Sequence, residues 1–101
     1  MNINWTVRGR KRFTAISNYI AEEFYPDYAD AWEDDVATTV EGLAVNPKIG
    51  TIAFPSLNRP ELRKILLSNK SYWVYYRISK TAIDILSVKH ILQDVRTPHN
   101  L

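Results

Sequence analysis

The segment Tyr72–Ile78 is dense in aromatic and β-branched residues and also carries Arg77. Successive side chains of a strand point to opposite faces of its sheet, so Trp73, Tyr75 and Arg77 are predicted to share one face. An indole, a phenol and a guanidinium on one surface suit base stacking and phosphate contact. The same groups are common anchors of protein interfaces. An aromatic strand packed beneath a loop, with Arg77 in an ion pair, is an equal alternative.

Proton transfer near neutral pH could come from His90, which follows the apolar segment 82–89. The more common role of a histidine at the end of a strand is a hydrogen bond to a backbone carbonyl. With Arg63 and Arg77 as cations, these three residues are the candidate catalytic set. The chain has no cysteine and its two histidines are nine residues apart, so we expect no metal site. The three glycines are scattered, so no phosphate-binding loop and no cofactor are expected either.

Charge is segregated along the chain, although the net charge is only +2. Residues 21–47 hold eight acidic side chains and no Lys or Arg, while the rest holds all 13 basic side chains and three acidic ones. Four of the basic residues begin the first predicted helix: Arg8, Arg10, Lys11 and Arg12. Cations there oppose the helix dipole, a cost that an acidic partner or a nucleic acid would offset. A solvated helix start beside a mildly basic sheet is the simpler alternative.

The apolar spacing predicts the elements that position these residues. Alternation over 3–7 indicates a strand. Apolar residues three and four apart predict one helix from about residue 10 to Pro26 and a second from Asp27, its expected N-cap, to Leu43. Residues 51–55 are expected to be extended, 62–67 are ambiguous between strand and helix but favour a strand, and 72–78 and 82–89 are predicted strands.

The order of these elements predicts an α+β fold: an N-terminal strand, an αα-hairpin and a three-stranded antiparallel meander. The helices are expected to cover one face of the sheet and to leave the other open for function. A single domain over residues 1–101, with a loose tail at 97–101, fits the length. No signal peptide or membrane-spanning run is visible, and the absence of cysteine fits a reducing compartment, so we expect a cytoplasmic protein.

Several local strings occur in a characteristic order between residues 3 and 94. They are Ile3-x-Trp5-Thr6, Tyr19-Ile20-Ala21, Leu43-Ala44-x-x-Pro47-x-x-Gly50, Pro60-Glu61-Leu62-Arg63, Tyr72-x-Val74-x-Tyr76-Arg77 and Ile83-x-Ile85-Leu86-x-Val88-x-His90-x-x-x-Asp94. Each string alone is weak, but their joint order and spacing resemble the RelE/ParE toxin superfamily, and within it the ParE-like, plasmid-stabilisation branch.

This resemblance implies the toxin of a type II toxin–antitoxin system, neutralised by a cognate antitoxin and acting by binding and poisoning DNA gyrase. The side chains expected to bind the target or partner are Trp73, Tyr75, Arg77, Arg8, Arg10 and Arg12. The resemblance leaves a homodimer open.

Two alternatives accompany the gyrase hypothesis. RelE-like members are ribosome-dependent endoribonucleases that cut messenger RNA, and here such an activity would use Arg63, Arg77 and His90. However, Trp73 occupies a place where nuclease members carry arginine, and the residues after His90 lack their basic and tyrosine side chains. The chain also lacks the arginines that commonly follow this histidine in ParE-like members. These departures favour a protein that is not an enzyme over the endoribonuclease. An inactive member that only binds an antitoxin is the second alternative.

Overall fold

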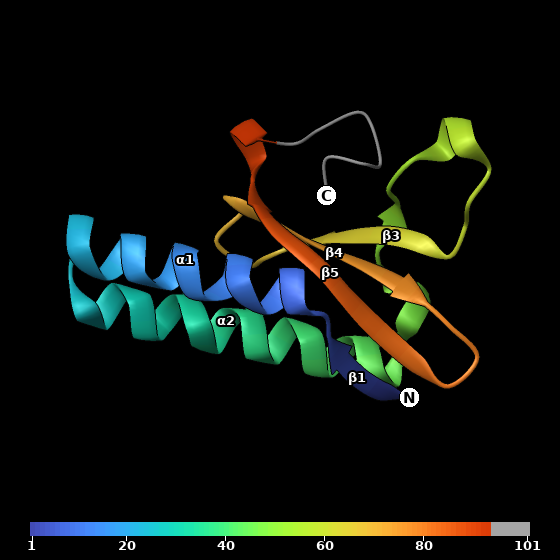
Figure 1. The fold of residues 1–101 in the computed structure, drawn as a ribbon, viewed down its shortest axis with the longest axis horizontal. Helices are drawn as coiled ribbons and strands as arrows, with labels where there is room; N and C mark the ends of the chain where they lie inside the picture. The colour runs from blue at the N-terminus through green and yellow to red at the C-terminus, as the bar shows by residue number, and fades with distance from the viewer. Residues whose placement is uncertain (94–101) are drawn as a thin grey trace.

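A helical hairpin packs against one face of a β-sheet (Figure 1). The computed structural model describes residues 1–93, so the tail expected at 97–101 lies outside the described residues. The elements are β1 (Asn2–Trp5), α1 (Val7–Glu23), α2 (Pro26–Val45), the 3-10 turn Pro47–Ile49, β2 (Thr51–Ile52), the 3-10 turn Pro55–Leu57, β3 (Leu62–Leu66), β4 (Tyr72–Ile78), β5 (Ala82–His90) and the 3-10 turn Ile91–Gln93.

The five strands form one mixed sheet in the order β1-β5-β4-β3-β2. The strands β3, β4 and β5 form the predicted antiparallel meander. At one edge, β1 pairs in parallel with β5, and at the other the two-residue β2 pairs with β3. The predicted α+β architecture is therefore confirmed, and the ambiguous segment at 62–67 forms a strand.

Both helices begin at residues that satisfy their first amide groups or suit their first turn. Thr6 caps α1, because its Oγ1 accepts a hydrogen bond from the Gly9 amide at 3.0 Å, so the helix starts earlier than predicted. Pro26 opens α2, where its restricted φ suits the first helical position. The prediction that Asp27 caps α2 is wrong. Tyr25 holds the cap position, and Asp27 lies in the first turn, where a carboxylate still interacts favourably with the helix dipole.

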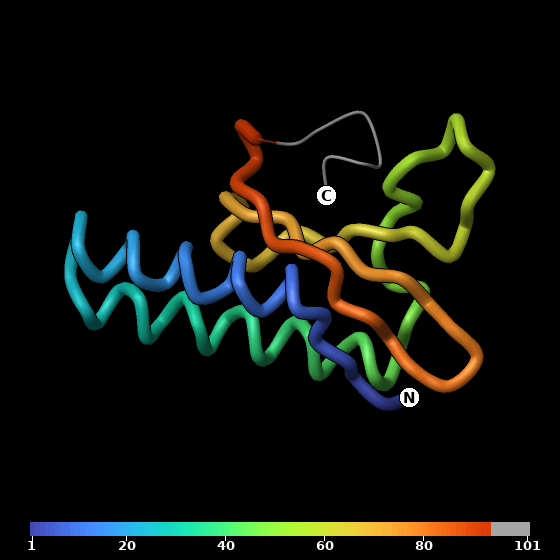
Figure 2. The backbone as a smooth tube through the Cα atoms, in the orientation of Figure 1, coloured from blue at the N-terminus to red at the C-terminus, as the bar shows by residue number. Residues whose placement is uncertain are grey.

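The start of α1 lies directly against β5, as the path of the chain in Figure 2 shows. The backbone amide and the Oγ1 of Thr6 both donate to the carbonyl oxygen of Ile85, at 3.2 and 2.7 Å. A Cβ atom on Gly9 would overlap this same carbonyl oxygen. Glycine is therefore required here for the close approach of helix to strand.

The core lies between the helices and the sheet. Its buried side chains are Ile16, Ile20, Ala29, Trp32, Val36, Val40 and Leu43 from the helices, Leu67 directly after β3, and Val74, Tyr76, Ile83, Ile85 and Val88 from β4 and β5. The Tyr76 hydroxyl donates to the Pro47 carbonyl at 2.7 Å and accepts from the Gly50 amide at 3.0 Å, which ties the end of the hairpin to the sheet. Opposite the step from Tyr75 to Tyr76, the pairing of β4 with β5 is interrupted by a bulge.

Candidate functional site

The sheet face that lies away from the helices is less open than the sequence predicted. Tyr75 is only 1% exposed, so the expectation that its side chain is available to a target is wrong. Its ring stacks against Phe54 at a centroid distance of 6.3 Å and an interplanar angle of 22°. Phe54 comes from the segment between β2 and β3, which therefore covers part of this face. Trp73 is half-buried and Arg77 is exposed, so the three side chains do not form one continuous surface.

Two lysines flank Trp73 on this face. The Nζ of Lys64 lies 4.4 Å from the centroid of the indole, a cation–π contact, and Lys89 is directly opposite Trp73 in the β4–β5 register. Lys89 is only 8% exposed, and burial, followed by the nearby charges of Arg12 and Arg8, lowers the pKa of its ammonium group. A lysine is rarely placed where burial and like charges both disfavour its charged form, and such positions cluster at functional sites.

Lys89 was not among the residues singled out from the sequence. The alternation of β5 places Ser87 and Lys89 on one face, but only the register with β4 brings Lys89 beside Trp73. The basic cluster around Trp73 therefore consists of Lys64 and Lys89 from β3 and β5, together with Arg8 and Arg12 of α1, whose charges act on Lys89.

Arg77 is committed to an ion pair at the opposite end of β4. Its Nη2 lies 2.7 Å from Oδ2 of Asp84, with which it is in register, and its side chain is about half exposed. Asn4 of β1 donates to the other carboxylate oxygen of Asp84 at 2.9 Å. These hydrogen bonds, first from Asn4 and then from Arg77, lower the pKa of the Asp84 carboxyl. The group links three adjacent strands, β1, β5 and β4.

Arg63 belongs to the other face of the sheet. In the β3–β4 register it pairs with Tyr76, a core residue, whereas Leu62 pairs with Arg77. Its guanidinium donates to the carbonyl oxygens of Pro60, Lys48 and Gly50, at 3.0, 3.3 and 2.8 Å. Through these three hydrogen bonds, Arg63 connects the segments that precede and follow β2.

His90 ends β5, where it pairs with Tyr72, and the two rings meet edge-to-face at 5.1 Å. Its Nδ1 accepts a hydrogen bond from the Leu92 amide at 3.1 Å. Arg77 pairs with Asp84 at the other end of the same strands, roughly 16 Å away at the usual rise of a strand. The structure therefore does not bring the three candidate catalytic residues together. Within residues 1–93, no group of His, Asp or Glu side chains is arranged to hold a metal ion.

The basic residues at the start of α1 lie on two different surfaces. Arg8 and Arg12 are one helical turn apart and lie near Lys89, whereas Arg10 lines a groove on the hairpin side. The helix has no acidic residue in its first turn and no basic residue in its last turn, which holds Glu22 and Glu23. The charges at both ends of α1 therefore oppose its dipole.

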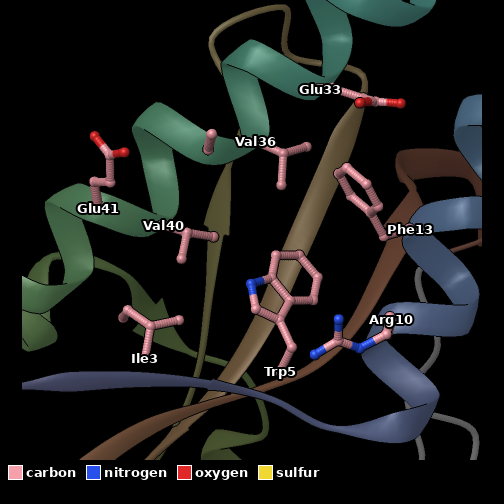
Figure 3. A pocket seen from close by; sticks show the side chains of 9 residues that line it. Ile3, Trp5, Arg10, Phe13, Glu33, Val36, Val40 and Glu41 are labelled. Atoms are coloured by element: carbon pink, nitrogen blue, oxygen red, sulfur yellow. The ribbon is translucent and has the colours of Figure 1, made fainter.

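A groove of about 440 Å³ opens between β1, α1 and α2 (Figure 3). Its apolar lining comprises Ile3, Trp5, Phe13, Val36, Ala37 and Val40. Figure 3 shows Val36 and Val40 pointing from α2 toward the indole of Trp5, which meets Phe13 edge-to-face at 5.4 Å. Arg10, Glu33 and Glu41 add charged groups to this lining. An apolar groove with a few charged groups is typical of a binding site for a peptide segment. Among the described residues, no helix is both long and apolar enough to span a membrane.

The same fold occurs among solved structures. The chain is similar to a chain of the structure titled "Chromosomal ParDE TA system from P. aeruginosa", with a TM-score of 0.74 and 22% sequence identity. The match covers 90% of this chain and 96% of the other, so the two share a fold over nearly their whole length. No curated protein sequence matches the chain.

The family model described as "ParE toxin of type II toxin-antitoxin system, parDE" matches residues 3–95. The chain therefore belongs to the ParE toxin family. This finding confirms the resemblance to the ParE-like branch that the local strings indicated.

Proposed function

We propose that the protein inhibits growth by binding and poisoning DNA gyrase, in the cytoplasm, until a cognate antitoxin neutralises it. The observation that carries the choice of gyrase over RNA is the separation of the candidate catalytic residues. Arg63 clamps backbone carbonyls, Arg77 is paired with Asp84, and His90 lies at the far end of the strands. RNA cleavage needs a base, an acid and positive charge around one phosphate. Family membership supports the same conclusion.

A supercoiling assay tests this proposal directly. Relaxed plasmid, ATP and purified gyrase are incubated with increasing amounts of the protein. We expect supercoiling to stop and cleaved plasmid to accumulate. Normal supercoiling at a large excess of the protein would rule out gyrase as the target.

The basic cluster around Trp73 favours a second candidate function, ribosome-dependent cleavage of messenger RNA. The indole of Trp73 lies beneath Lys64 and beside Lys89. An aromatic ring next to two cations suits the binding of a nucleotide, with the base on the ring and the phosphate near the lysines. Ribosomes translating a defined message would then yield cut fragments, and Lys89→Ala would reduce the cutting. An intact message in this assay rejects the ribonuclease.

Expression without an antitoxin separates both active toxins from an inert family member. We expect growth to stop when the chain is induced alone and to resume when the antitoxin is co-expressed. Unimpaired growth at a confirmed protein level would instead indicate a module that only binds an antitoxin.

The groove between β1, α1 and α2 is the site that we propose for the antitoxin. Its apolar lining and mixed charges fit an amphipathic segment. Ala37 is exposed and lines the groove, so Ala37→Arg should fill it without removing a core contact. Thr38 is also exposed but does not line the groove, and Thr38→Arg is the matched control.

We expect Ala37→Arg to weaken antitoxin binding at least tenfold in calorimetry, while Thr38→Arg binds like the parent. Equal binding by the two variants would place the antitoxin elsewhere. Size-exclusion chromatography of the free protein in the same experiment reports whether it forms a homodimer.

A further inference from the structure

The turn between α1 and α2 carries four large aromatic side chains that are between 54% and 65% exposed. We call this surface the hairpin tip, and its aromatic residues are Tyr19, Phe24, Tyr25 and Tyr28. They meet edge-to-face in pairs: Tyr19 with Phe24 at 6.5 Å and Tyr25 with Tyr28 at 5.5 Å. In Figures 1 and 2 the turn lies at the end of the hairpin farthest from β1. Clustered exposed aromatic side chains on a small protein mark an interaction surface.

The charged residues in the turn of the hairpin tip and in the helix ends beside it are all acidic. They are Glu22 and Glu23 in the last turn of α1, and Asp27 and Asp30 at the start of α2, and all four are exposed. No Lys or Arg occurs between residues 21 and 47. Glu22 and Glu23 also lie at the negative end of the α1 dipole, where their charges are unfavourable. A cationic partner would relieve both the mutual repulsion and the interaction with the dipole.

The negative charge of the hairpin tip determines which kind of partner can bind there. Two copies of the hairpin tip would bring eight carboxylates together, and the phosphates of a nucleic acid or an anionic membrane would be repelled in the same way. A protein segment rich in arginine fits, because guanidinium groups pair with carboxylates and also stack on tyrosine rings.

We propose that the hairpin tip is a docking surface for a basic segment of the gyrase. This inference rests on the proposed function. An enzyme that handles DNA must present Lys and Arg along the path of the duplex, and an acidic, aromatic projection is complementary to such a surface. The contact is separate from the antitoxin groove, because Tyr19, Phe24, Tyr25 and Tyr28 do not line that groove.

Binding of purified gyrase to immobilised protein tests the inference. The double variant Tyr25→Ala/Tyr28→Ala removes two exposed rings, and Glu22→Gln/Glu23→Gln removes two charges without changing shape. Val45→Ala, at an 87% exposed apolar residue at the other end of α2, is the matched control. Circular dichroism should show unchanged folding for all three variants, because the altered side chains are exposed.

We expect the tyrosine variant to raise the Kd for gyrase at least tenfold, and the glutamine variant to raise it about threefold and to reduce its salt dependence. The control should bind like the parent. If the parent protein binds gyrase and the tyrosine variant binds equally well, the inference fails while the proposed function stands. If the parent protein does not bind gyrase at all, both fail. Self-association that is lost in the tyrosine variant would assign the tip to a second copy and overturn the inference.

Discussion

Replacing Gly9 with alanine is the sharpest test of how α1 is positioned against the sheet. The added methyl group would overlap the carbonyl oxygen of Ile85, which already accepts hydrogen bonds from both the amide and the hydroxyl of Thr6. Ile85 lies in β5, between β1 and β4, so its carbonyl cannot move without disturbing two strand pairings. The helix must therefore move instead.

The expected cost follows from opposing contributions. Alanine in place of glycine favours a helix by up to about 1 kcal/mol. Overpacking against an immobile group costs roughly 1–3 kcal/mol. Displacing Thr6 weakens two hydrogen bonds that contribute about 0.5–1.5 kcal/mol each. The net expectation is a loss of about 2 kcal/mol in the free energy of unfolding, which lowers the Tm of a domain of this size by roughly 8–16 °C.

Gly42 provides the matched control. It lies in α2, is exposed, and a Cβ placed there would meet nothing within 4 Å apart from its chain neighbours and the backbone of its own helix. Gly42→Ala should therefore raise the free energy of unfolding by about 0.5–1 kcal/mol. Urea denaturation followed by circular dichroism measures both variants, and the two changes should have opposite signs. A Gly9→Ala variant as stable as the parent would refute the close approach of α1 to β5.

Two further predictions concern titrating groups. Hydrogen bonds from Asn4 and Arg77 lower the pKa of Asp84, so this carboxylate stabilises the fold above its ordinary pKa of about 4 and stops doing so as the pH falls through the lower folded value. Urea denaturation across that pH range measures the free energy of unfolding, and Asp84→Asn should make it fall less steeply as the pH is lowered. The same pH dependence in the parent and the variant would contradict the stabilising role of the Asp84 carboxylate. Burial and the charges of Arg12 and Arg8 lower the pKa of Lys89, so the folded protein carries the full cost of this charge below the folded pKa. The cost is lost as the pH rises from the folded pKa to the ordinary value of about 10.4. Lys89→Gln should raise the urea midpoint at pH 7 while weakening target binding, and a lower midpoint would show that Lys89 is structural.

The sequence predicted the elements and their order because the signals that define them are local. Spacing of three and four between apolar residues indicated the two helices, and alternation indicated the strands, including the parallel partner β1 as an N-terminal strand. The edge strand β2 was anticipated only as an extended segment, because two residues carry too little pattern. The α2 cap was mispredicted by two residues, since proline at the first helical position shifted the start.

The candidate site was less predictable because its contacts are not local. Alternation correctly separates the faces of β4, but it cannot reveal that Phe54, 21 residues earlier, covers Tyr75. Likewise, the position of Arg63 on the core face depends on its pairing with Tyr76. The role of Lys89 depends on the register between β4 and β5. Each of these contacts requires the tertiary arrangement, which residue spacing alone does not supply.

The charges at the two ends of α1 change how dissolved salt acts on the free protein. Salt usually weakens stabilising surface ion pairs, but here it screens cations at a positive helix end and carboxylates at a negative one. Rising ionic strength should therefore make this helix more stable, while it loosens complexes formed through those same ends. A partner of opposite charge bound at either end of α1 also compensates the charges that oppose the helix dipole. The helix therefore becomes more stable in the complex than in the free toxin.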